Sequence, residues 1–131
     1  MSSEDPVREC QLRRASLCQL LHWLALGRIQ PQALAEAYQS AIERVDPELN
    51  AYVDLRPGLF EEQARNASRR RREGVMGRLD GIPIALKDNF DVAGWPTRAG
   101  LPGREAPAED DAHVVARLRA SGALLIGKTN M

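Results

Sequence analysis

The sequence predicts an α/β fold from the order of its apolar segments. Short apolar runs at residues 82–86 and 123–126 are typical of buried strands. Between them, residues 111–121 repeat apolar side chains at helical spacing, so the three segments form a β-α-β unit with parallel strands. Two further helical patterns precede this unit and indicate an N-terminal helical pair. The chain has 131 residues, which is enough for one modest domain.

The two N-terminal helical patterns cover residues 16–26 and residues 31–46. Gly27 suits the position after the first helix, and Pro31 suits the first turn of the second, where a missing N–H costs nothing. The second pattern ends before a proline. Residues 1–15 precede both patterns and are expected to be a loose N-terminus. The apolar stripe of the second helix consists of Leu34, Ala37, Tyr38, Ala41, Ile42 and Val45.

The middle of the chain predicts one strand and one helix. Residues 50–55 form a short strand that the following Pro-Gly pair breaks. Residues 59–73 form a third helix, which ends at Gly74. Its last turn carries four consecutive arginines at residues 69–72. Because they complement the helix dipole and no aromatics are interleaved, we expect them to be solvated.

The fourth helix, residues 111–121, carries the cap and core signals of the β-α-β unit. Asp110 or Asp111 is expected to cap its N-terminus, and Gly122 suits the position after its end. Its core face is expected to consist of Val114, Val115 and Leu118.

Charge and metal-ligand content exclude several functional classes. The chain has 18 basic and 18 acidic side chains, so no net field steers it to nucleic acid or an acidic membrane. Cys10 and Cys18 are too few for a disulfide framework. His22 and His113 each stand alone on a predicted helix, without a partner at ligand spacing. The sequence therefore predicts no metal site and, by default, a reducing cytoplasm.

The N-terminal region carries a weak resemblance to an export signal. Arg13 and Arg14 precede the apolar run at residues 17–26. Acidic residues share the leading region, polar residues interrupt the run, and it is too short to span a bilayer. We therefore expect a cytoplasmic amphipathic helix.

Two further motifs have weak structural context. Residues 122–129, GALLIGKT, match the P-loop expression. A P-loop follows a strand, whereas this motif follows a helix and its Ala-Leu-Leu-Ile core is itself typical of a buried strand, so nucleotide binding is not expected. Asp88, Asn89 and Asp91 miss the spacing of a calcium loop and favour turn formation.

Lys87 is the candidate functional residue, because it stands where the strand at residues 82–86 ends. Alternation places it on the face with Pro83 and Ala85, opposite the bulky aliphatics. If the two strands are neighbours, Lys87 and Lys128 emerge at the carboxyl edge of the sheet, where open α/β sheets form binding crevices. The pattern alone favours a packing role, in which the stem covers apolar surface and the ammonium reaches water.

Two long stretches resemble the amidase signature family in order and spacing. They are GRLDGIPIALKDNFDVAGWPT at residues 77–97 and DAHVVARLRASGALLIGKTNM at residues 111–131. The segment IERVDPELNAYV at residues 42–53 is similar to the family's N-terminal part. The resemblance covers residues 16–131, which are identified as the N-terminal portion of one amidase domain that continues beyond Met131.

The resemblance implies an α/β fold around a large mixed sheet, and it implies hydrolysis of a carboxamide to an acid and ammonia or an amine. The chemistry passes through a serine acyl-enzyme with a Ser-cisSer-Lys triad and uses no metal or organic cofactor. Lys87 matches the catalytic lysine. The two serines belong to a Gly/Ser-rich segment expected after Met131, so the chain alone is expected to be inactive.

The resemblance also sets expectations for the surroundings of Lys87. A lysine that accepts a proton must be neutral, and burial disfavours the ammonium, so we expect Lys87 to be desolvated in a cleft with Asp88 pointing away. Lys128 is expected to bond backbone near the site. Arg98 and Leu101 stand where the family more often has small or hydroxylated residues, which indicates an unusual substrate channel.

Three functions stay open at this point. The first is an amidase acting on small or aryl amides in the cytoplasm, without direct nucleic-acid or membrane contact and with a homodimer as one option. The second is the A subunit of a glutamyl-tRNA(Gln) amidotransferase, which would need companion subunits. The third is a non-catalytic binding module, which would require a natural stop codon after Met131.

Overall fold

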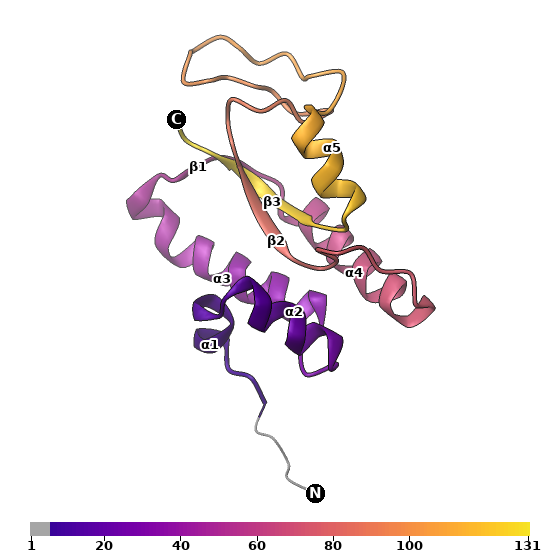
Figure 1. The fold of residues 1–131 in the computed structure, drawn as a ribbon. Coiled ribbons are helices and arrows are strands. Elements are labelled where there is room, and N and C mark those ends of the chain that lie inside the picture. The colour runs from indigo at the N-terminus through magenta and orange to yellow at the C-terminus, as the bar shows by residue number, and fades with distance from the viewer. Residues whose placement is uncertain (1–5) are drawn as a thin grey trace, which may run out of the picture.

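The computed structural model describes residues 6–131, which form helices packed on a small mixed sheet (Figure 1). The predicted α/β class is confirmed. In chain order the elements are α1 (Glu9–Arg14), α2 (Leu17–Ala25), α3 (Pro31–Leu49), β1 (Tyr52–Leu55), α4 (Pro57–Glu73), β2 (Pro83–Lys87), α5 (His113–Ala120) and β3 (Leu124–Thr129).

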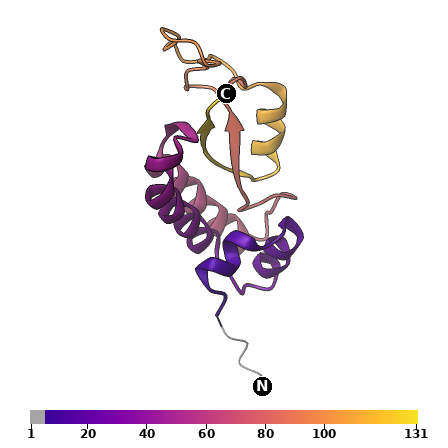
Figure 2. The ribbon, with the colours of Figure 1, turned by 90° about the vertical axis from the view of Figure 1, so that its left-hand side faces the viewer.

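The sheet is organised around β3, the last strand in the chain. The strand order is β1-β3-β2, and β3 runs parallel to β2 and antiparallel to β1. The predicted parallel pair is therefore confirmed, with α5 in the crossover between its strands. Helices α3 and α4 lie on one side of the sheet and α5 lies on the other (Figure 2).

The apolar run of β3 is continuous because both of its faces are covered. Leu124 and Ile126 pack with Phe60 and other residues of α3 and α4. Leu125, which points the opposite way, packs with Val115 of α5. A strand between two helical layers has no polar face to alternate with, which is why its sequence reads as an unbroken apolar stretch.

The N-terminal helices bury their apolar faces at the start of β2. One cluster joins Leu20 and Leu24 of α2, Leu34 of α3 and Ile82. Leu12 of α1 belongs to the same cluster and is 4% exposed. The expectation of a loose N-terminus is therefore wrong over residues 9–14, which form a helix anchored by Leu12, whereas residues 1–5 lie outside the described part.

Two helix boundaries differ from prediction at prolines. Helix α3 continues through Pro47 to Leu49 and ends where Asn50 adopts a left-handed conformation at φ 51°. The Asp46 carboxylate stabilises this end by accepting the N–H of Ala51 at 2.8 Å. Pro57 begins α4 instead of separating it from β1, because a proline fits the first turn of a helix.

Helix α5 begins without the predicted aspartate cap. Its N-cap residue is Ala112, which makes no side-chain cap bond. The Asp111 carboxylate instead accepts the N–H of Ala93 at 2.8 Å and pairs with Arg119 at 2.9 Å. Val114, predicted for the core face, is 41% exposed, so Val115 is the buried anchor of this helix.

The arginine run at the end of α4 is only partly solvated. Arg70 Nε lies 2.7 Å from Oδ1 of Asp80, and an Arg71 terminal nitrogen donates to the Asp80 carbonyl at 2.7 Å. Asp80 is 1% exposed. The prediction of a solvated run is therefore wrong for these two arginines, since they supply the counter-charge for a buried carboxylate just before β2.

Gly127 allows β3 to approach β1 closely. A Cβ atom at this position would lie 2.6 Å from the Asp54 carbonyl oxygen and 2.8 Å from Cδ2 of Leu55. At Gly58, near the start of α4, an added Cβ would meet nothing within 4 Å. The two glycines therefore differ in whether the surrounding structure has room for a methyl group.

Substitution of these glycines tests the packing of β1 on β3. Gly127→Ala should lower the free energy of unfolding by about 1–3 kcal/mol, because the methyl group overpacks a backbone contact that cannot move away. Gly58→Ala should change it by at most about 1 kcal/mol, in the stabilising direction, since alanine restricts the unfolded chain and favours the helix. Urea denaturation of both variants measures the difference, and equal effects would contradict the close approach.

Candidate active site

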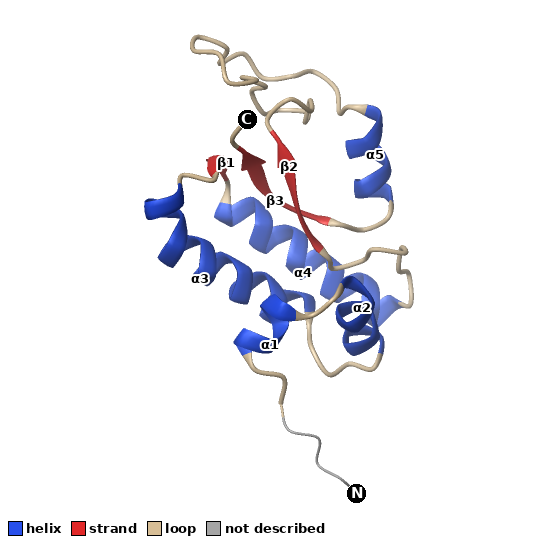
Figure 3. Cartoon of the chain, turned by 60° about the vertical axis from the view of Figure 1, so that its left-hand side comes forward, coloured by secondary structure: helices blue, strands red, loops and turns tan. Residues whose placement is uncertain are grey.

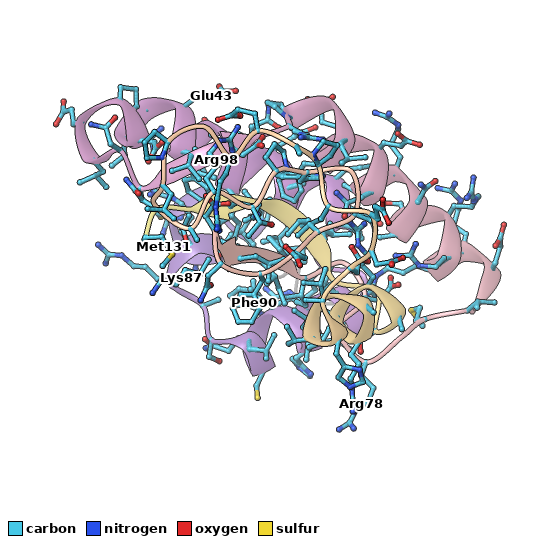
Figure 4. All side chains as sticks on the ribbon, turned by 90° about the horizontal axis from the view of Figure 1, so that it is seen from above. Glu43, Arg78, Lys87, Phe90, Arg98 and Met131 are labelled. Carbon is cyan, nitrogen blue, oxygen red and sulfur yellow. The ribbon has the colours of Figure 1, made fainter. Side chains whose placement is uncertain are left out.

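The carboxyl ends of β2 and β3 lie together at one edge of the sheet. Leu86 is in register with Lys128, and Lys87 with Thr129. The prediction that both lysines emerge at this edge is therefore confirmed. Figure 4 looks down on it, with Lys87, Phe90 and Met131 labelled near one another. The long loop between β2 and α5 starts here (Figure 3).

Lys87 is exposed, and the residues on both sides of it are buried. Leu86 and Asp88 point into the protein, so alternation aims Lys87 outward. The expected desolvation of Lys87 is therefore not found in this chain. The physical reason is that Leu86 and Asp88 take the buried face, and the described residues leave the face with Ala85 and Lys87 open to water. Asp88 points away from Lys87, as expected.

Lys128 is the buried lysine of the pair, with 0% of its surface exposed. Its ammonium lies 2.8 Å from Oδ1 of Asp88 and donates to the Pro96 carbonyl at 2.7 Å and to Oγ1 of Thr97 at 3.0 Å. The ammonium therefore has two hydrogen bonds and one ion-pair contact. The prediction that Lys128 bonds backbone near Lys87 is confirmed, and the ion pair with Asp88 is an addition that the sequence pattern did not predict.

Beyond the ion-pair contact of its Oδ1, the other polar groups of Asp88 are hydrogen-bonded. Its second carboxylate oxygen accepts the N–H of Arg98 at 3.2 Å. Its own N–H donates to the Thr129 carbonyl, and its carbonyl accepts the N–H of Ala99, both at 3.0 Å. Asp88 therefore joins the end of β2 to β3 and to the loop at residues 96–99.

An outer set of charged contacts fastens the same loop to β1. Arg98 pairs with Glu105 at 2.7 Å and lies 3.6 Å from a carboxylate oxygen of Asp54. The hydrogen bond that Arg98 donates to the Glu105 carboxylate raises the pKa of Arg98 and lowers the pKa of the Glu105 carboxyl. Arg56 stacks over Trp95 with its guanidinium carbon 4.2 Å from the ring centroid. Arg98, which the sequence comparison with the family had singled out, thus holds the loop against β1 through Asp54.

A wide hollow lies beside the loop, away from Lys87. It encloses about 630 Å³ and is lined by residues of the loop at 91–112. Lys87 is not among the lining residues. The charged residues among its lining are Asp91, Arg104, Glu105, Glu109, Asp110 and Asp111.

The other sequence motifs do not build a site within the described residues. The P-loop match falls on β3, and its lysine is the buried Lys128, so there is no phosphate-binding loop. Residues 6–131 contain no group of three or more metal-ligating side chains that could hold an ion. His22 and His113 are both exposed. No helix over this range is long and apolar enough to cross a membrane.

The different surroundings of the two lysines give a direct test. Lys128→Met should lower the free energy of unfolding by about 3–5 kcal/mol, because it leaves the buried Asp88 carboxylate without its counter-charge. Lys87→Met should change it by less than about 0.5 kcal/mol, since an exposed side chain is replaced. Urea denaturation of both variants measures this contrast. A larger loss for Lys87→Met would contradict the assignment of burial.

Comparison with known proteins relates this chain to amidases. A family model described as Amidase matches residues 33–131. The putative amidase AmiA2 of Mycobacterium tuberculosis (strain ATCC 25618 / H37Rv) is 42% identical over 118 residues, which cover 90% of this chain and 24% of the relative. The A subunit of the glutamyl-tRNA(Gln) amidotransferase of Methylobacillus flagellatus is 42% identical over 119 residues, which cover 88% of this chain and 24% of the relative.

Solved structures agree with the sequence matches. The native peptide amidase from Stenotrophomonas maltophilia has a TM-score of 0.83 at 36% identity, over 89% of this chain and 25% of its own. An amidase family protein from Bacillus anthracis has a TM-score of 0.85 at 30% identity, over 94% of this chain and 25% of its own. The chain thus spans about a quarter of the length of the relatives that it matches. It belongs to the amidase signature family.

Proposed function

We propose that residues 16–131 are the N-terminal part of one amidase domain and that the complete protein hydrolyses a carboxamide to an acid and ammonia or an amine. The observation that carries this proposal is the position of Lys87. It lies within the residues that match the family model, at the carboxyl end of the parallel pair β2–β3. That edge is where open α/β sheets bind their ligands. The length of the relatives supports a continuation beyond residue 131.

The proposed mechanism uses two serine hydroxyls and Lys87. Neutral Lys87 accepts the proton of a bridging serine, which takes the proton of the nucleophilic serine as that oxygen attacks the amide carbonyl. The C–N bond then breaks, and the same relay in reverse protonates the leaving nitrogen. Water hydrolyses the resulting acyl-enzyme. These steps call for no metal or organic cofactor, and we place the enzyme in the cytoplasm with a small-molecule amide as substrate.

None of the described serines of this chain is placed as a nucleophile beside Lys87, because they cap helices, bond other groups or lie exposed on a helix. This supports the proposal that the two catalytic serines come from another part of the sequence. Ser16 caps α2, Ser68 donates to Gln32 at 2.7 Å, and Ser121 donates to a carbonyl in α5. Ser40 is exposed on α3, and the two serines before residue 6 lie outside the described range. We infer that the nucleophile, its bridging partner and the surface that desolvates Lys87 lie in sequence beyond residue 131. The isolated chain is then inactive.

A second candidate is supported by one specific similarity. The amidotransferase A subunit of Methylobacillus flagellatus is as similar to this chain as the putative amidase AmiA2 is, at 42% identity. In an enzyme of that kind the same chemistry would release ammonia for a partner protein. Co-purification of the full-length protein under its native promoter separates the two functions. Stoichiometric companion subunits would favour the amidotransferase, and a protein without them would favour the stand-alone amidase.

Substitution of the proposed base tests the amidase function. In the full-length protein, Lys87→Ala should reduce labelling of the nucleophilic serine by a fluorophosphonate probe by a factor of about 10² or more, because a general base is lost. Arg78→Ala is the control, since Arg78 is exposed and lies far from Lys87 in Figure 4. Labelling by the Lys87 variant at the rate of the control would refute the assignment. The isolated 131-residue chain should not be labelled.

A further inference from the structure

We propose that the buried Asp88–Lys128 ion pair is a positioning device for Lys87, which fixes the backbone that carries the proposed base. The inference rests on the proposed function, in which Lys87 accepts the proton. Asp88 and Lys128 do not touch substrate in this proposal. They act through Lys87, and their effect is on the rate of acylation.

The contacts of Asp88 fix the backbone next to Lys87. Asp88 comes directly after Lys87, and its N–H, its carbonyl and both carboxylate oxygens are all engaged. The Lys87 carbonyl itself accepts the N–H of Phe90 at 3.1 Å. Lys87 therefore stands on backbone that is held on its C-terminal side, while its own side chain stays exposed.

The position of Lys128 extends this hold to the loop. Its ammonium bonds the Pro96 carbonyl and the Thr97 hydroxyl in addition to Asp88. The Lys128 nitrogen atom of β3 thus joins Asp88, at the end of β2, to residues 96–97 of the loop. Loss of this nitrogen would free the loop and the end of β2 together, and a shift of about 1 Å in a catalytic group can cost about 10²-fold in rate.

The cost of burying the pair argues against stability as its sole role. Removing an ammonium and a carboxylate from water costs several kcal/mol per ion, and apolar side chains of similar volume commonly give equal or greater stability. Lys128 is 0% exposed and Asp88 is 1% exposed. By contrast, the two arginines that pair with Asp80 just before β2 keep part of their side chains in water, with Arg70 33% and Arg71 15% exposed. Complete burial of both charges thus distinguishes the pair next to Lys87 from the pair at Asp80.

The Lys128 ammonium balances the charge of Asp88 on the buried side of β2. The other charged groups packed around the pair are Asp54, in register with Lys128 on β1, and its partners Arg56 and Arg98, the latter also bound to Glu105.

The test uses the full-length enzyme and the rate of inactivation by a fluorophosphonate probe. The double variant Asp88→Asn/Lys128→Met should regain most of the stability that Lys128→Met loses, because no buried charge is left unpaired. Its kinact should nevertheless fall by about 10²-fold with KI unchanged, counted per active site by titration with limiting probe.

Two further variants keep the test decisive. Thr97→Val removes one partner of Lys128 without unpairing a charge, so it should fold and show a smaller loss of kinact at unchanged KI. Asp80→Asn breaks the other buried ion pair and should lower stability alone, with kinact per active site unchanged. Wild-type kinact in the double variant overturns the inference. If that variant does not fold, wild-type kinact in Thr97→Val overturns it. If Lys87→Ala instead leaves the labelling rate unchanged, the proposed function itself is refuted.

Discussion

Lys128 carries a full positive charge into the interior of the protein, and the carboxyl edge of the sheet is arranged around it. Asp88 supplies the counter-charge, and the loop supplies a carbonyl and a hydroxyl. Because a buried ammonium without these partners would cost several kcal/mol, the end of β2, the end of β3 and residues 96–97 are held in one arrangement. Lys87 projects from that arrangement toward water. The position of Lys87 therefore follows from the ion pair and hydrogen bonds that Asp88 and Lys128 make beside it.

Local sequence signals predicted the elements that depend on local chemistry. The positions of Gly27 and Gly74 correctly end α2 and α4, since both adopt positive φ. The unbroken apolar run of β3 and the helix before it correctly predicted a parallel pair with β2. From that pair, the common edge of Lys87 and Lys128 followed directly. These features need only the period of the apolar pattern and the rule that parallel strands end on the same side.

The features that were missed depend on contacts that no local pattern specifies. Asp80 pairs with two arginines of α4 that precede it by nine and ten residues, and no spacing rule joins them. The Gln63 side chain both donates to and accepts from the backbone of Leu125, and so replaces a strand neighbour at a point beyond the end of β1. Burial of Lys128 in place of Lys87 has the same origin. It depends on Asp88 facing inward, one residue further along the alternation.

In the full-length protein, Lys87 is proposed to be a general base held at a fixed position. Two serines from another part of the sequence would complete the catalytic triad. The most direct measurement is a crystal structure of that protein, with the distance from Lys87 Nζ to the nearest serine Oγ as its readout. We predict a separation of roughly 2.6–3.2 Å to a serine in a Gly/Ser-rich segment, with the Lys87 amine shielded from water. A Lys87 Nζ in bulk water, with no such segment beside it, would contradict this role.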